Sequence, residues 1–188
     1  PMQETRYAVQ YKGVTGMLRA AGVPDAEALG RRAEALGEAL LAPGRCLTMG
    51  DLWPRSVLVA EDKLHLIDWE LAHYGRPLQD VAHFRAHLWM LAHRAPSPTV
   101  ANAARALRNA FRSAYDRALE AAKARLWTDQ ERRDAAVHTG AEILVRVLGP
   151  FQSGYLYEGL PPNHPAVQEA VTMAVDSIRA PESGGTWK

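Results

Sequence analysis

The sequence predicts a mainly α-helical protein with one small β-hairpin. Apolar residues recur at helical spacing over most of the 188 residues. Two short apolar runs typical of β-strands, at 56–59 and 64–67, interrupt this pattern, and the charged residues 61–63 stand between them. The length suits a single domain, which we expect to span 1–182, with a mobile Gly/Ser-containing tail at 183–188.

Helix-breaking residues set the expected order of elements. Proline and glycine at 43–44 and at 149–150 end two helical patterns, and Thr128 with Glu131 forms the capping box that begins another helix. A further Gly/Pro-rich loop at 154–162 precedes the last helix, which begins near Pro165. Helices are therefore expected at 4–21, 24–41, 78–94, 99–126, 128–148 and from 165 onward.

The composition argues against several classes of protein. With 22 Lys and Arg against 21 Asp and Glu, the formal charge of +1 lacks the basic excess typical of nucleic-acid binders. No apolar run approaches the roughly 20 residues of a membrane span. The single cysteine, Cys46, forms no internal disulfide, which is typical of a reducing compartment. We therefore expect a cytoplasmic protein with neither nucleic acid nor membrane as its partner.

Three oxygen-bearing side chains flank the predicted hairpin. Asp51 precedes the first strand, Ser56 begins it and Asp68 ends the second strand. Because a hairpin brings its two ends together, we expect these side chains to converge. Phosphoryl transfer requires a carboxylate that accepts a hydroxyl proton and hard oxygen ligands for magnesium. The structural alternative is that the aspartates are ordinary turn and strand-end residues.

Two motifs in this stretch resemble those of the aminoglycoside phosphotransferase and choline kinase family. Residues 49–59, MGDLWPRSVLV, are similar to its catalytic loop, HGDxxxxN followed by three hydrophobic residues. Residues 67–70, IDWE, followed by Gly75, Pro77 and Asp80, are similar to its metal-binding segment. Both motifs stand in the family's order and separation. The resemblance implies the helical C-terminal lobe of a protein-kinase-like fold.

The resemblance also implies roles for individual residues. Asp51 would be the catalytic base, and Asp68 the principal ligand of Mg²⁺ in an ATP-dependent reaction. Ser56, which stands where the family has Asn, would be the second metal ligand. Asp80 would brace the catalytic loop, and Glu70 would help to hold metal or substrate.

The sequence departs from the family pattern in three ways. Met49 replaces the usual His, and Ser56 replaces the usual Asn. The 50 residues before Asp51 read as two helices, so the β-rich lobe that covers the nucleotide is expected to be absent. Phosphorylation of a small hydroxylated molecule would then require that the chain is a fragment, or that a separate polypeptide supplies this N-lobe.

A second hypothesis is a repurposed protein without nucleotide or metal cofactor. Asp51 or Asp68 would then perform general acid/base chemistry in a lyase, isomerase or cyclase, or the cleft would only bind a small molecule. Trp53, His83 and His87 are candidates to line that cleft. We expect the two histidines to face the surface or a groove and not to bind zinc, because no third ligand stands at zinc-like spacing. An exposed apolar face would favour a homodimer.

Overall fold

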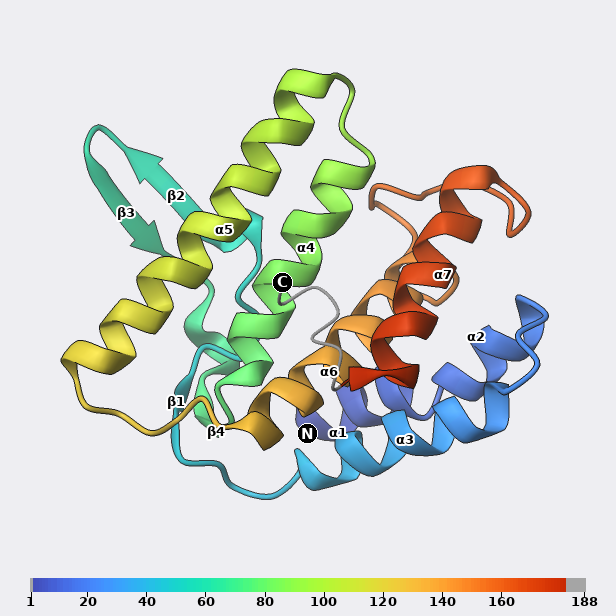
Figure 1. Ribbon diagram of the computed structural model, residues 1–188, viewed down its shortest axis with the longest axis horizontal. Coiled ribbons are helices and arrows are strands. Elements are labelled where there is room, and N and C mark those ends of the chain that lie inside the picture. The colour runs from blue at the N-terminus through green and yellow to red at the C-terminus, as the bar shows by residue number, and fades with distance from the viewer. Residues whose placement is uncertain (1, 182–188) are drawn as a thin grey trace.

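The computed structural model describes residues 2–181 and confirms the mainly helical class with a small β component. The predicted tail at 183–188 lies outside the described residues. The helical elements are α1 (Met2–Arg6), η1 (Tyr7–Tyr11), α2 (Val14–Ala20), α3 (Ala26–Ala39), η2 (Pro54–Ser56), η3 (Trp69–Leu71), α4 (Leu78–His93), α5 (Pro98–Ala121), α6 (Asp129–Val147) and α7 (Pro165–Arg179). Figure 1 shows α4, α6 and α7 stacked across the middle of the molecule.

The first predicted helix is interrupted in the structure. A π-helical turn, η1, separates α1 from α2, and the Lys12 N–H donates to the carbonyl of Tyr7, five residues earlier. Gly13 permits this wide turn, because a Cβ there would lie only 2.5 Å from the carbonyl oxygen of Val9. The apolar periodicity therefore predicted the extent of this segment and not its change of pitch.

The predicted hairpin forms and projects from the helices (Figure 1). Strand β2 (Val57–Ala60) pairs antiparallel with β3 (Lys63–Leu66), with Val57 opposite Leu66. Glu61 adopts a positive φ of 55° in the tight turn. Val59 and Leu64 are each more than 70% exposed, so the hairpin contributes little to the core.

A second antiparallel pair was not predicted. Strand β1 (Cys46–Thr48) pairs with β4 (His73–Gly75), which lies between the predicted hairpin and the helix expected from residue 78. The two strands have three residues each and lie far apart in the sequence, so neither carries a recognisable alternation. Their pairing closes residues 49–72 into one long loop that leaves the helical body. This loop contains the first motif and the IDWE residues of the second.

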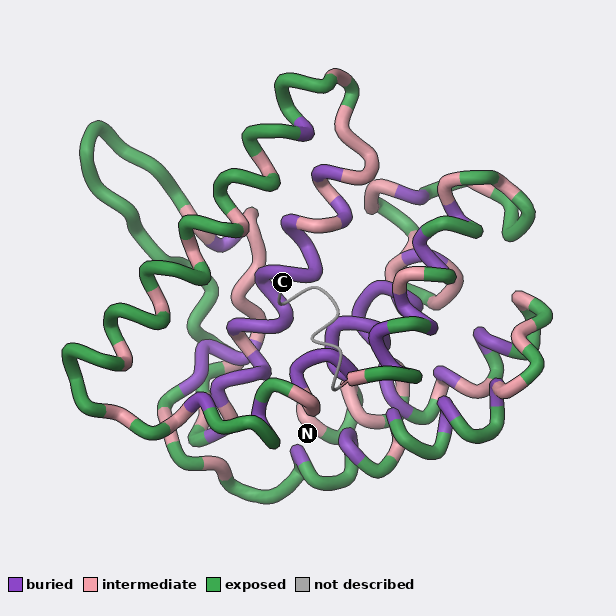
Figure 2. The backbone as a smooth tube through the Cα atoms, viewed as in Figure 1, coloured by how far each residue is buried: buried purple, intermediate pink, exposed green. Residues whose placement is uncertain are grey.

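The hydrophobic core is centred on α4 and α6. Both helices are buried around most of their circumference, because α5, α7 and the N-terminal helices cover them (Figure 2). Helix α5 is largely exposed, with Ala101 its one buried residue. Within the described residues, no helix is both long and apolar enough to cross a bilayer.

The close approach of α6 and α7 gives a first prediction. A Cβ on Gly140 would lie 2.6 Å from both the Ala174 carbonyl oxygen and Cγ1 of Ile178. Gly140→Ala should therefore reduce the free energy of unfolding by about 1–3 kcal/mol in urea titrations. Gly16→Ala is the matched control, since nothing lies within 4 Å and alanine favours the helix by up to about 1 kcal/mol. Equal effects of the two substitutions would contradict this packing.

Candidate functional site

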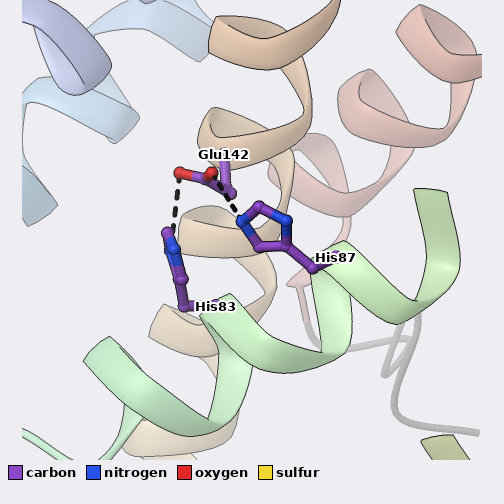
Figure 3. Close-up of side chains that lie close together, drawn as sticks. All are labelled: His83, His87 and Glu142. Atoms are coloured by element: carbon purple, nitrogen blue, oxygen red, sulfur yellow. Dashed lines mark ion pairs between the residues drawn. The ribbon is translucent and has the colours of Figure 1, made fainter. Parts of the chain in front are cut away.

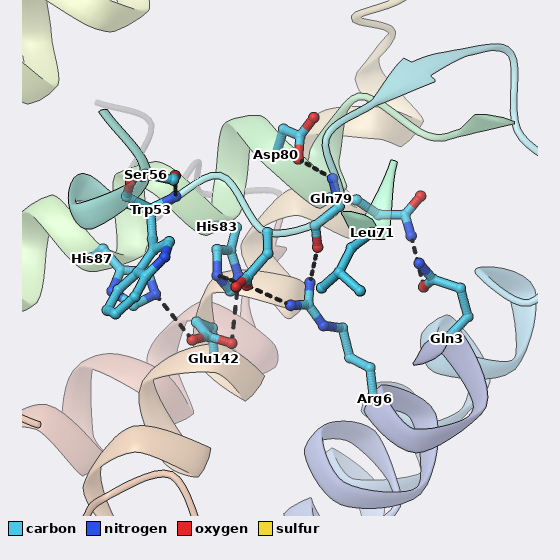
Figure 4. A network of polar contacts seen from close by, with 12 residues as sticks. Gln3, Arg6, Trp53, Ser56, Leu71, Gln79, Asp80, His83, His87 and Glu142 are labelled. Carbon is cyan, nitrogen blue, oxygen red and sulfur yellow. Dashed lines mark hydrogen bonds and ion pairs between the residues drawn. The ribbon is translucent and has the colours of Figure 1, made fainter. Parts of the chain in front are cut away.

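The loop after β1 is held by the carboxylate of Asp80, in the first turn of α4. Its two oxygens accept the backbone N–H groups of Met49, at 2.6 Å, and of Gly50, at 2.9 Å. Gly50 has a φ of 85°, and a Cβ there would lie 2.5 Å from the Leu71 carbonyl oxygen. The glycine thus allows a sharp turn, and Asp80 fixes it in place (Figure 4).

Two side chains contact the carboxylate of Asp51 at the end of this turn. Arg6 donates from Nη2 to Asp51 Oδ1 at 2.7 Å and from Nη1 to the Gly50 carbonyl at 2.7 Å. Nε2 of His83, on α4, lies 3.2 Å from the same Oδ1. Within the described part of the chain both side-chain contacts fall on Oδ1, which leaves Oδ2 for a ligand.

The environment of Asp51 keeps its carboxyl group ionised. Burial raises the pKa, but the contact with His83 and the charges of His83 and Arg6 outweigh this and hold the pKa well below its ordinary value. The side chain remains 29% exposed. Asp51 is therefore a fixed, partly accessible acceptor of hydrogen bonds.

The proposed metal ligands lie in different surroundings. Asp68 follows β3 in a left-handed conformation, φ 66°, and is exposed, as is Glu70 in η3. Ser56 is fully buried, and its hydroxyl donates to the Trp53 carbonyl at 2.8 Å and accepts from the Trp53 N–H at 3.1 Å. The Ser56 hydroxyl thus closes the η2 turn, and the prediction that it ligates magnesium does not fit. Among the described contacts, none joins Asp51 to Asp68 or Ser56.

A cavity of about 260 Å³ opens beside Asp51. Arg6, Trp53 and Phe151 are among the residues that line it. Trp53 also lines a second cavity of about 270 Å³ that reaches Tyr155. A larger cavity, about 830 Å³, lies at the far end of α5 and contains no residue of either motif. Size alone therefore does not mark the candidate site.

His83 and His87, which were predicted to line the cleft, lie in the protein interior. His83 and His87 are fully buried, because α6 and the Tyr155 loop cover the face of α4 that carries them. Both approach the buried carboxylate of Glu142 on α6. Burial lowers the pKa of His87 to about 4, so its imidazole is neutral near pH 7. The expectation that the two rings face an open groove was wrong.

Sequence reasoning missed Arg6 and Glu142. Arg6 lies 45 positions before Asp51, and Glu142 stands inside a long helical segment, so no local motif marks either one. Only the packing of α1 and α6 against the loop brings them to the site (Figure 4).

Comparison with known proteins identifies the family. A sequence model described as the phosphotransferase enzyme family matches residues 3–136. The chain belongs to the phosphotransferase enzyme family. The match includes both motif segments and begins within α1, the helix that supplies Arg6. No curated protein matched the chain.

Membership in the phosphotransferase family confirms the resemblance drawn from the two motifs. The helical architecture also fits the helical lobe of this family's kinase-like fold. At the level of the family, the activity is that of a kinase-like phosphotransferase.

The contact of Asp80 with the loop predicts a measurable effect. In Asp80→Asn the amide keeps one acceptor oxygen, but its NH₂ group faces the second backbone N–H and leaves it unsatisfied. We expect a loss of about 1–3 kcal/mol in the free energy of unfolding and faster hydrogen exchange at Met49 and Gly50. Asp116→Asn on the exposed face of α5 is the control. Unchanged exchange at the two loop amides would show that Asp80 does not brace the turn.

Proposed function

We propose that this phosphotransferase-family protein transfers a phosphoryl group from ATP to a hydroxyl group of a small molecule. Asp51 orients that hydroxyl and accepts its proton. The observation that carries the proposal is the double restraint on the catalytic loop, with Asp80 holding its backbone and Arg6 holding both Gly50 and the Asp51 carboxylate.

Such restraint is what this reaction demands. Phosphoryl transfer passes through a loose transition state, so positioning and charge contribute more than strong basicity. A carboxylate with a low pKa is a weak base but a reliable hydrogen-bond acceptor, and Asp51 has this character. Its Oδ2 is the atom proposed to receive the hydroxyl proton.

Magnesium would bind at Asp68. Mg²⁺ commonly takes one or two protein carboxylates and completes its shell with water and nucleotide phosphates. The exposed carboxylate of Asp68 suits this arrangement. The hydroxyl of Ser56 does not, because it is already hydrogen-bonded to the backbone of Trp53. When bound, the ion would neutralise phosphate charge. Glu70, two residues later, is also exposed and would help to hold metal or substrate.

A nucleotide-covering lobe completes the proposed enzyme. The described residues form no β-rich lobe, so a further segment or a second polypeptide would supply it. A homodimer, with a second copy of the chain, is the alternative partnership. The exposed apolar side chains of the β2–β3 hairpin, such as Val59 and Leu64, would contact this lobe.

The acceptor would enter the cavity beside Asp51. Trp53, Leu71 and Phe151 give this cavity apolar walls, while Arg6 and Arg146 are already paired with carboxylates. A cavity of about 260 Å³ suits a small acceptor or one part of a larger molecule.

A radiolabel assay tests the proposal. The chain, together with the segment or polypeptide that carries the nucleotide-covering lobe, is incubated with magnesium and γ-labelled ATP. The acceptors tested are grouped as neutral sugars, amino sugars, amino alcohols and hydroxy acids. We expect labelled product from one group, and none after addition of EDTA. The absence of labelled product in every group would contradict the proposal.

The Ser56 hydroxyl is bound to the backbone of Trp53 and is not offered as a second magnesium ligand. This favours one competing function, a cofactor-independent lyase, isomerase or cyclase that uses Asp51 or Asp68. Turnover of a small molecule that persists in EDTA and falls in Asp51→Asn would support this second function in place of the first.

A further inference from the structure

Two histidines and a glutamate form a compact buried cluster between α4 and α6. His83 and His87 lie one turn apart on α4 and face Glu142 on α6 (Figure 3). All three side chains are at most 1% exposed. One ligand atom from each lies within 4.8 Å of the other two. Two imidazoles and a carboxylate are a common protein ligand set for zinc.

The distances in the cluster suit a shared ion. Oε2 of Glu142 lies 3.5 Å from Nδ1 of His83, and Oε1 lies 3.2 Å from Nε2 of His87. Zinc binds such ligands at about 2.0–2.2 Å in a tetrahedron, which places neighbouring ligand atoms roughly 3.3–3.5 Å apart. Each separation therefore suits a histidine nitrogen and a carboxylate oxygen that share an ion, with a different oxygen of Glu142 facing each ring.

The hydrogen-bond geometry of these contacts also favours a shared ion. Although the atoms are close, neither ring nitrogen of His83 nor Nε2 of His87 makes a well-directed hydrogen bond. Buried polar atoms are normally hydrogen-bonded, so three such nitrogens in one cluster require an explanation. A cation between the rings and the carboxylate would satisfy the two that face Glu142.

The far nitrogen of each ring has a polar neighbour. Nδ1 of His87 lies 2.5 Å from the hydroxyl of Tyr155, and Nε2 of His83 lies 3.2 Å from Oδ1 of Asp51. Histidine ligands usually donate their second N–H to such a group, which fixes the ring and the nitrogen that faces the metal. The cluster thus has candidate outer contacts as well as ligands.

The carboxylates around His83 also favour a bound cation. The ring lies between two of them, with Nε2 3.2 Å from Oδ1 of Asp51 and Nδ1 3.5 Å from Oε2 of Glu142. Arg146 donates to the other oxygen, Oε1, at 2.8 Å. Oε2 is therefore the oxygen that most needs a cation.

We propose that His83, His87 and Glu142 bind one Zn²⁺ ion, which joins α4 to α6 behind Asp51. The site is separate from the magnesium site at Asp68 and does not rest on the proposed function. Its three ligands are buried, and Trp53 packs against the His87 ring, with 5.6 Å between ring centroids. The ion would therefore be enclosed between the two helices, with its fourth position left to a ligand from outside this set. The local sequence around the two histidines contains no third ligand, and Glu142 would supply it from another helix.

Metal titration tests the site directly. Protein stripped with a chelator and dialysed is titrated with Zn²⁺ in competition with a chromophoric chelator. We expect one equivalent of tight binding to the wild-type chain. His87→Gln and Glu142→Gln should weaken it by more than about 100-fold. His65→Ala, which removes an exposed histidine of β3, should leave it unchanged.

A second measurement needs no variant. X-ray absorption of the zinc-loaded wild-type protein should show only nitrogen and oxygen ligands, with the outer-shell scattering of two imidazoles. Failure of the wild-type chain to bind one equivalent of Zn²⁺ would overturn the proposal. So would a sulfur ligand from Cys46, or binding that survives both the His87 and the Glu142 substitutions.

Discussion

Replacing Asp51 with asparagine is expected to lower the rate of phosphoryl transfer by about 10²- to 10⁴-fold. The amide keeps the size of the side chain but cannot accept the hydroxyl proton, and it loses the charge that pairs with Arg6. The effect should fall on kcat much more than on the KM for the acceptor, because the lost interaction forms at the transition state. Steady-state kinetics with the acceptor found in the radiolabel assay would measure it.

Asp62→Asn provides the matched control for this experiment. Asp62 lies in the exposed turn of the β2–β3 hairpin, so the substitution removes the same charge away from the loop. It should leave kcat within about twofold of the wild type, since exposed substitutions rarely disturb a distant site. Near-normal transfer by a folded Asp51→Asn protein would exclude Asp51 as the proton acceptor.

The largest effect on stability is expected at Glu131, in the first turn of α6. Its carboxylate is 2% exposed and accepts the Leu78 N–H at 3.2 Å and two donors of Arg76, at 2.9 and 3.2 Å. Glu131→Ala would leave a largely buried guanidinium with only Asp134 and would leave the first turn of α4 uncapped. We expect the free energy of unfolding to fall by about 3 kcal/mol.

Asp129→Ala tests whether burial causes this loss. Asp129 pairs with Arg132 in the same turn of α6, but its side chain is 85% exposed. Exposed ion pairs contribute about 0–1 kcal/mol, so this substitution should be nearly neutral in urea titrations. Equal losses from the two substitutions would show that the turn, and not the buried ion pair, determines stability.

Local signals in the sequence predicted most of the fold. Thr128 caps α6 as expected, since its hydroxyl accepts the Glu131 N–H at 3.2 Å. The other half of the expected capping box was wrong, because the Glu131 side chain turns to Arg76 on a different segment. Tertiary contacts thus redirected a side chain whose backbone position the sequence pattern predicted correctly.

The candidate site was harder to predict, because its contacts come from distant segments. The motif at 49–59 predicted Asp51 as a site residue. Helix packing brings Arg6 and His83 into contact with Asp51. The four-residue spacing of His83 and His87 predicted a shared face of α4 and could not show that α6 buries it. Long-range pairing of this kind leaves no periodic signal in either segment.

Isothermal titration with Mg·ATP is the most direct test that this chain contains the working half of a phosphotransferase site. Wild-type protein and Asp68→Ala are compared, with Asp62→Ala as a control that removes a neighbouring exposed carboxylate. We predict saturable binding to the wild type and to the control, and its loss in Asp68→Ala. No binding by the folded wild-type chain, or equal binding by Asp68→Ala, would contradict the magnesium–nucleotide site.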